Sequence, residues 1–215
     1  MPSEAYKHFR VNVIDVSRLI EAHNELSPNH RGRRALGHIT RSGVVMLCAC
    51  WELYVESVLI EAARYLGNNV NSVHSLPLDV RKNLSNLVKT ASHELKPLEL
   101  TGDGWKSVYD AYCCQEVKAL NTPKSVKISD LFKKYIGISD VVTIWNTDAT
   151  FIDSFVGLRG DIAHNGRFTT YVSIGTLEMY TKTIYENCKY MDNEICSYLH
   201  GLVGETVQPW RRATK

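Results

Sequence analysis

The chain has 215 residues, of which 44% are apolar and 22% charged, a composition that fits one globular domain with a sizeable core and excludes a disordered or fibrous chain. The formal net charge is only +2, so there is no overall signal for polyanion binding, and any nucleic-acid surface must be a local patch. The six cysteines include no Cys-x-x-Cys pair, which argues against a zinc site and predicts reduced thiols in the core.

Helical periodicity dominates the first third of the chain. Apolar residues recur at three- and four-residue spacing over residues 4–25, behind Ser3 as a predicted helix cap. The longest pattern, over residues 35–66, is stopped by Gly67 and is apolar on nearly every side, which predicts a central core helix. Its longest apolar run, residues 43–51, is far too short to span a bilayer, and the first residues lack an apolar export segment. We therefore expect a cytoplasmic protein without a membrane span.

The remaining helices follow in order, with short breaks. Periodicity and stop signals predict them over residues 77–95, 105–120 and 129–136, behind a Ser129 cap in the last case. Another helix is expected from a cap at Thr147-Asp148 to about residue 165. Its core face uses either Phe151, Phe155 and Leu158 or the set through Ile152 and Val156.

A final long helix is predicted behind Ser173, with Gly201 and Gly204 as its end. Long helices with scarce strand-like alternation predict an all-α fold, an antiparallel helical bundle, in a single domain over residues 1–205. Residues 206–215 form a basic C-terminal tail, which we expect to be disordered and to offer an auxiliary phosphate contact.

Two polar features of the first half have competing interpretations. Glu52 and Glu56 lie one turn apart on the central helix, where paired acids can be catalytic or bind metal, but more often form a wet stripe or hold an arginine of a neighbouring helix. We prefer the structural interpretation. The cluster of Arg31, Arg33 and Arg34 is the best local basic patch, either a solvated loop or an RNA contact.

The most informative stretch is residues 151–167. Arg159 precedes His164 by five residues at the tail of an apolar helix, whose stop signal is Asn165 followed by glycine. Asp161 lies three residues before His164 and could hold its ring in one tautomer, while Arg167 follows directly. Histidine can move a proton near neutral pH, and the guanidinium fork fits a phosphate, so these types suit phosphodiester chemistry.

One regular helix cannot bring both residues to one substrate. Five residues advance roughly 500° and about 7.5 Å, which points the side chains about 140° apart. The arginine and histidine therefore need either a distorted turn or a second copy of the motif.

Three segments in order resemble the HEPN superfamily, in particular its RiboL-PSP-like domains of bacterial toxin, phage-defence and RNA-processing settings. They are the helix with Glu52 and Glu56, residues 121–137, and Arg159 to Gly166, within a likeness that spans roughly residues 40–200. The resemblance implies a helical bundle that dimerises so that two Arg/His motifs share one cleft.

The resemblance also implies a metal-independent endoribonuclease without a cofactor. His164 is expected to deprotonate a ribose 2′-hydroxyl, Arg159 to stabilise the phosphorus centre, and a cyclic phosphate to result. Single-stranded RNA is the expected substrate, since a rigid duplex resists the required alignment. Asn165 and Arg167, with the arginine cluster at residues 31–34, are the expected RNA contacts.

One departure leaves an alternative open. The residue after the arginine is usually polar in active members, whereas here it is Gly160, with Asp161 one position later. Either Asp161 takes over the orienting role, or the chain is an inactive HEPN module that binds RNA, a nucleotide or a partner such as an antitoxin or another operon product. A third reading, a carboxylate metal protein based on Glu52 and Glu56, lacks the expected Glu-x-x-His pairs.

Overall fold

The computed structural model describes residues 1–27, 36–204 and 208–214. These residues form seven α-helices and four short 3-10 helices and contain no strand, which confirms the all-α prediction. In chain order the elements are α1 (Glu4–Leu26), α2 (Gly37–Asn69), η1 (Val73–Ser75), α3 (Leu78–Lys89), η2 (Lys96–Leu100), α4 (Gly104–Val117), α5 (Ser125–Ile136), η3 (Val141–Ile144), α6 (Ala149–Asn165), η4 (Gly166–Phe168) and α7 (Ile174–Val203).

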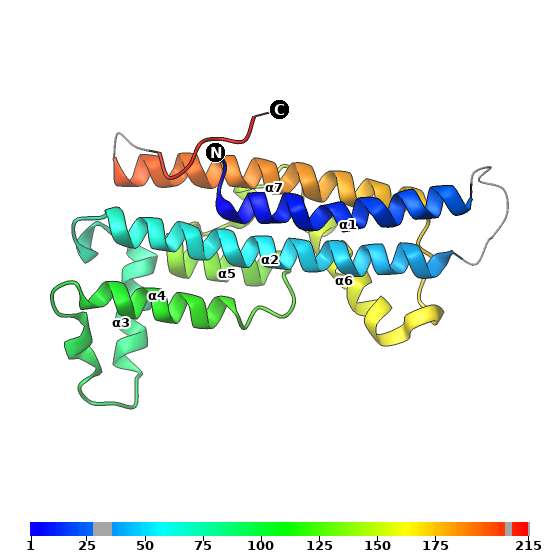
Figure 1. The fold of residues 1–215 in the computed structure, drawn as a ribbon. Coiled ribbons are helices and arrows are strands. Elements are labelled where there is room, and N and C mark those ends of the chain that lie inside the picture. Colours follow the sequence, from blue (N-terminus) through cyan, green and yellow to red (C-terminus); the bar gives the residue numbers. More distant parts are fainter. Residues whose placement is uncertain (28–35, 205–207, 215) are drawn as a thin grey trace.

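Helix α2 is the centre of the fold, as its apolar pattern predicts. It packs against α1, α4, α5, α6 and α7, and α1 and α7 lie beside it as long helices (Figure 1). By length and composition it is apolar enough to cross a membrane, but 56% of its most apolar window is buried inside the protein. That burial is what the central helix of a globular bundle requires.

The three long helices do not all alternate in direction. Helix α1 runs antiparallel to α2, since the backbone N–H groups of Glu4 and Ala5 donate to the Glu61 carboxylate, both at 3.1 Å. Helices α2 and α7 run parallel: Thr40 near the start of α2 donates to the Val172 carbonyl at 2.8 Å, and Tyr54 further along donates to Cys188 at 2.9 Å. More than 100 residues separate α2 from α7, so no short turn forces them to alternate.

Gly43 allows α2 and α7 to approach closely. A Cβ atom at this position would lie 2.5 Å from Leu177 Cδ2, far inside ordinary contact distance. The absence of a side chain at Gly43 therefore sets the spacing of the two helices at the end where α6 meets α7.

Three predicted helix caps are confirmed. The side chains of Ser3, Asp148 and Ser173 each accept a hydrogen bond from the backbone N–H three residues later, at the starts of α1, α6 and α7. Helix boundaries near the caps therefore follow the sequence closely.

The predicted Ser129 cap is wrong, because α5 begins four residues earlier. Asp153 of α6 accepts hydrogen bonds from the backbone N–H of Ser125 at 2.7 Å and from its hydroxyl at 2.8 Å, which fixes the first residue of α5. Ser129 lies inside the helix, and its hydroxyl accepts from the N–H of Val141 at 3.2 Å.

Helix α3 is shorter than predicted. It ends at Lys89 instead of residue 95, and the chain turns before η2, which packs against α3 and α4. The predicted helical spacing of residues 90–95 therefore does not continue α3.

Helix α6 buries both of its alternative core faces. Ile152, Phe155 and Val156 are fully buried, and Phe151 and Leu158 pack against the core while partly exposed. A helix that contacts α2 on one side and α5 on the other must bury more than one apolar stripe.

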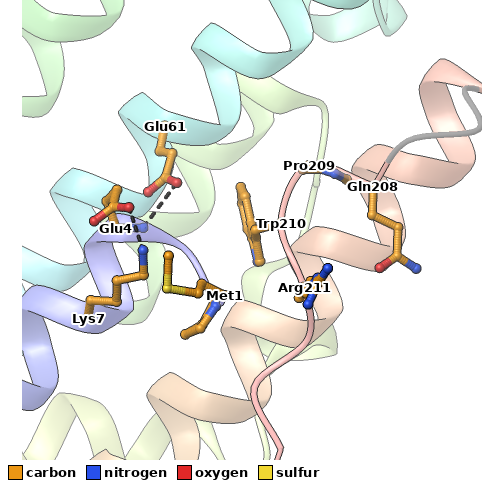
Figure 2. Close-up of a pocket in the computed structure, with 9 residues that line it drawn as sticks. Met1, Glu4, Lys7, Glu61, Gln208, Pro209, Trp210 and Arg211 are labelled. Atoms are coloured by element: carbon orange, nitrogen blue, oxygen red, sulfur yellow. Dashed lines mark hydrogen bonds and ion pairs between the residues drawn. The ribbon is translucent and has the colours of Figure 1, made fainter.

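The described part of the C-terminal tail is docked, so the expectation of disorder is wrong for residues 208–214. Trp210 is 8% exposed, and its indole N–H donates to the Asp192 carbonyl of α7 at 3.1 Å. The Asn193 carboxamide binds the backbone of Ala213 through both of its polar atoms. Figure 2 shows Trp210 and Arg211 on this segment beside Met1. One buried indole anchors the tail to the bundle.

The cysteines match the sequence prediction. All six are free thiols, and all but Cys114 are buried. They pack as small apolar side chains.

Candidate functional site

Helix α6 carries the Arg159 and His164 motif on its last turns. The helix is regular from the Asp148 cap through Asn165 and stops at Gly166, whose φ of 52° lies in the region that favours glycine. The motif therefore sits at a helix end, where polar side chains reach the surface, as the sequence predicts.

Arg159 is held against the body of the protein by two oxygens. Its Nη2 lies 3.4 Å from Glu52 Oε2 on α2 and donates to the backbone carbonyl of Asn121, in the link between α4 and α5, at 3.2 Å. The other guanidinium N–H groups donate to no oxygen of the described residues. The Cys48 thiol also lies beside the guanidinium and raises the pKa of Arg159. The side chain is 26% exposed, so a ligand could reach only part of it.

The contact confirms the structural interpretation of Glu52, an acid that holds an arginine on a neighbouring helix. Both side chains are about one quarter exposed, at 23% for Glu52 and 26% for Arg159. Burial raises the pKa of the Glu52 carboxyl above its usual value, and the positive charge of Arg159 opposes that shift. Arg159 therefore offsets part of the cost of burying this carboxylate.

The Glu56 carboxyl and the Cys48 thiol are also partly or fully removed from water. Burial raises the pKa of the Glu56 carboxyl, and the charge of Glu52 one turn away adds to the increase. Burial likewise raises the pKa of the Cys48 thiol, while nearby Arg159 acts in the opposite direction. Glu56 makes no ion pair with a described residue, so Glu52 alone of the two acids holds the arginine.

His164 is exposed on the far side of the helix end, and so are Asp161, Asn165 and Arg167. Neither His164 nor Asp161 has a hydrogen bond or ion pair to any residue within 1–27, 36–204 or 208–214. The orienting role of Asp161 stays a prediction. Arg31, Arg33 and Arg34 lie outside the described residues.

The structure does not unite Arg159 and His164 within one chain. Helix α6 has no distorted turn between them, so the two side chains leave it in directions about 140° apart. Arg159 faces α2 and the link between α4 and α5, whereas His164 faces solvent. The distorted turn is therefore absent, and the second copy of the motif stays a prediction.

A groove of about 540 Å³ lies between the first half of α2 and the end of α6. Its rim carries Arg41 and Arg167, and its floor is apolar, with Met46 39% and Val45 38% exposed. A surface with both cationic and apolar groups directly beside the motif suits an interface that also admits a phosphate.

Sequence reasoning missed two aromatic residues near the motif. Phe168 is 95% exposed and Tyr171 69% exposed, in the short link between α6 and α7. Large aromatic side chains in a polar loop are a recognisable signal, since they are rarely left in water without a partner.

Among residues 1–27, 36–204 and 208–214, no group of three or more His, Cys, Asp or Glu side chains is placed to hold a metal ion. Glu52, half of the acidic pair considered for metal binding, is paired with Arg159 instead.

Comparison with known proteins gives one match. The family model described as RiboL-PSP-HEPN matches residues 12–197, which include every helix from α2 to α6 and most of α1 and α7. No curated protein and no solved structure matches the chain. The matched range contains both Arg159 and His164.

Proposed function

This chain belongs to the RiboL-PSP-HEPN family, and we propose that it is an endoribonuclease that cleaves single-stranded RNA with protein groups alone. The observation that carries the proposal is the placement of Arg159, which Glu52 and Asn121 anchor through one nitrogen and which stays about one quarter exposed, five residues before an exposed His164. A fixed cation and a free imidazole are the two groups that such a cleavage needs.

In the proposed reaction a ring nitrogen of His164 accepts the proton of a ribose 2′-hydroxyl. The 2′-oxygen attacks the adjacent phosphorus, the bond to the 5′-oxygen of the next nucleotide breaks, and the leaving oxygen takes up a proton from water. Arg159 stabilises the extra negative charge on the phosphorus centre. The products are a 2′,3′-cyclic phosphate and a 5′-hydroxyl.

The proposed active form is a homodimer, since one chain points the two groups apart. The exposed apolar side chains of Val45 and Met46 lie on α2 in the groove beside the end of α6, and Phe168 and Tyr171 lie in the following link. A two-fold axis across this surface would cover the apolar groups and place Arg159 of one chain opposite His164 of the other.

The direct test is RNA cleavage by the purified protein in EDTA. Wild-type protein is expected to produce fragments with 2′,3′-cyclic phosphate ends, and His164→Ala and Arg159→Ala to reduce the rate by about 10² or more. Cleavage that both variants retain would come from a contaminant and would refute the assignment.

A mixture of the two inactive variants tests the composite site. If each site combines one chain's arginine with the other chain's histidine, a heterodimer of Arg159→Ala and His164→Ala contains one intact site. An equimolar, fully exchanged mixture then recovers roughly one quarter of the wild-type rate. A mixture as inactive as its components would show that both groups come from one chain.

Gly160 favours a second candidate, a HEPN module that binds RNA or a partner protein without cleaving. A Cβ atom at Gly160 would meet no described atom within 4 Å beyond its own helix, so the space that a polar side chain would fill is open. Dimers that bind RNA but yield no cyclic phosphate would support this candidate. In either case the proposed setting is a cytoplasmic toxin–antitoxin, defence or RNA-processing system, with an antitoxin-like partner as the restraint.

A further inference from the structure

A second hollow, of about 610 Å³, lies between the start of α1, the middle of α7 and the C-terminal segment 208–214. Its charged side chains are Arg10, Lys189, Arg211 and Arg212, and no aspartate or glutamate is among the described residues that line it. Only Arg212 has an ionic partner, Glu194 at 3.5 Å. In a chain with a net charge of +2, three cations without an ionic partner around one hollow are a marked local excess.

The neighbouring hollow shows that this excess is not general at this end of the protein. On the other side of Met1 and Arg211, a hollow of about 580 Å³ contains Glu4 and Glu61 (Figure 2). Glu4 pairs with Lys7, and Glu61 accepts from the first N–H groups of α1. Glu4 and Glu61 therefore have partners within their own hollow. They do not compensate the cations of the 610 Å³ hollow.

The cationic hollow is built by tertiary structure. Arg10 comes from α1, Lys189 from α7, and Arg211 from the segment that Trp210 anchors, where the Arg211 N–H also donates to the Met1 carbonyl at 2.9 Å. The Tyr6 and Tyr185 rings, 6.2 Å apart between centroids, form part of the wall. Docking of the tail therefore brings cations from three segments to one place.

We propose that this hollow is a second binding site for the phosphate backbone of single-stranded nucleic acid, separate from the Arg159 and His164 motif. The cations are long side chains from separate segments, and Arg10, Arg211 and Arg212 are exposed. Such an arrangement fits successive phosphates of a strand better than one compact anion, which would need convergent buried donors. Contacts to phosphates alone carry no base preference and do not distinguish DNA from RNA.

The proposed site adds an RNA-binding surface to the proposed nuclease. Only the assignment of RNA as its natural ligand rests on the proposed function. Lys189 lies about four turns into α7, roughly 22 Å of helix rise from the end of the helix that adjoins the motif. An RNA bound here would be retained by the protein while another part of the strand reaches the cleavage site.

The test measures binding of a short fluorescein-labelled single-stranded DNA to the full chain by fluorescence anisotropy across a range of KCl concentrations. DNA lacks the 2′-hydroxyl, so cleavage does not interfere. Arg10→Gln and Lys189→Gln are each expected to weaken binding several-fold and to reduce the slope of log K against log salt by about 0.7. The double variant is expected to show both effects added.

Matched controls lie on the same two helices. Lys182→Gln on α7 removes the same charge as Lys189→Gln outside the hollow, and Arg18→Gln does so for Arg10→Gln on α1, although Arg18 pairs with Asp15 at 3.1 Å. Both are expected to leave affinity and slope near wild type. Arg10 and Lys189 make no ion pair with a described residue, so their variants are expected to keep the wild-type melting temperature.

Equal losses of DNA affinity in the hollow variants and in the controls would overturn the proposal. Competition by poly-glutamate as strong as that by unlabelled DNA of matched charge would also overturn it, because it would indicate general polyanion binding. The outcome is independent of catalysis. Normal DNA binding by the Arg10 and Lys189 variants would remove the second site while leaving the nuclease untouched. Loss of binding in a protein that cleaves no RNA would leave the site standing without the nuclease.

Discussion

The substitution Glu52→Gln tests whether the anchored arginine is a working part of the proposed nuclease. The change keeps the size of the side chain and an oxygen that can accept a hydrogen bond, but removes the charge 3.4 Å from Arg159 Nη2. The bond from Arg159 to the Asn121 carbonyl remains. The substitution therefore loosens one of two anchors without opening a cavity.

The expected effect on stability is small. At 3.4 Å the attraction is about 5 kcal/mol for an effective dielectric constant near 20, before any cost of desolvation. Both side chains are about one quarter exposed, and net contributions of such pairs are mostly about 1 kcal/mol or less. The raised pKa of the Glu52 carboxyl shows that its burial is itself unfavourable, so glutamine recovers part of the loss. We expect the free energy of unfolding to fall by no more than about 1 kcal/mol.

The expected effect on cleavage is larger. Loss of a complete charge-stabilising donor costs about 10² to 10³ in rate, which sets the upper limit. A guanidinium that keeps the Asn121 anchor should lose only part of this rate contribution. We expect kcat to fall about tenfold, equivalent to about 1.4 kcal/mol, with little change in KM. Single-turnover cleavage of a labelled RNA measures the rate, and chemical denaturation measures the stability.

Glu56→Gln is the matched control, one turn along the same face with a carboxyl whose pKa burial also raises but with no ion pair to a described residue. Its cleavage rate is expected to stay near wild type. Equal rates for the two variants would refute the positioning role of Glu52. Faster cleavage by Glu52→Gln would reverse the reasoning, because Glu52 would then compete with the phosphate for the arginine.

Two other properties can be tested without RNA or with the same assay. Burial raises the pKa of Asp192 to about 6, opposed by hydrogen bonds from Ser3, so the folded state holds a proton that the unfolded state releases near pH 4. The free energy of unfolding of the wild type, relative to that of Asp192→Asn, should therefore fall by up to about 3 kcal/mol from pH 4 to pH 7. Denaturant titrations measure this difference. A difference that does not change with pH would show that Asp192 does not titrate in this range. Gly160→Ala and Gly157→Ala enter open space on α6 and should each stabilise the protein by up to about 1 kcal/mol. Only Gly160→Ala is expected to slow cleavage, and equal rates would mean that the space beside Arg159 is not used by the substrate.

The helix starts were predictable where the cap and the helix are neighbours in sequence. Ser3, Asp148 and Ser173 bind N–H groups three residues away, so local spacing contains the information. The start of α5 was not predictable in this way, because Asp153, 28 residues later, supplies the bond to Ser125. The docked tail is a similar case, since the partner of Trp210 is a carbonyl of α7.

The same distinction holds for the candidate site: features set by neighbouring residues were predictable, and features set by distant residues were not. The exposed position of His164 follows from the helix stop at Gly166, which the sequence contains. The sequence also allowed Glu52 to hold an arginine, but it could not choose Arg159 among the arginines of the chain. The second anchor, the Asn121 carbonyl, is a backbone atom whose position depends on the path of the link between α4 and α5, and no side-chain pattern encodes it.

The two halves of the motif are held in different ways, and this difference bears on control. Arg159 is fixed within each chain before any partner arrives, whereas His164 is exposed and has no hydrogen bond or ion pair to a described residue. In the proposed dimer, assembly therefore both orders the base and brings it opposite the arginine. A partner protein that covered the exposed side chains of Val45 and Met46 would keep the two groups apart without touching either one. Control of such a nuclease would then act on assembly, while the groups that perform the chemistry stay unchanged.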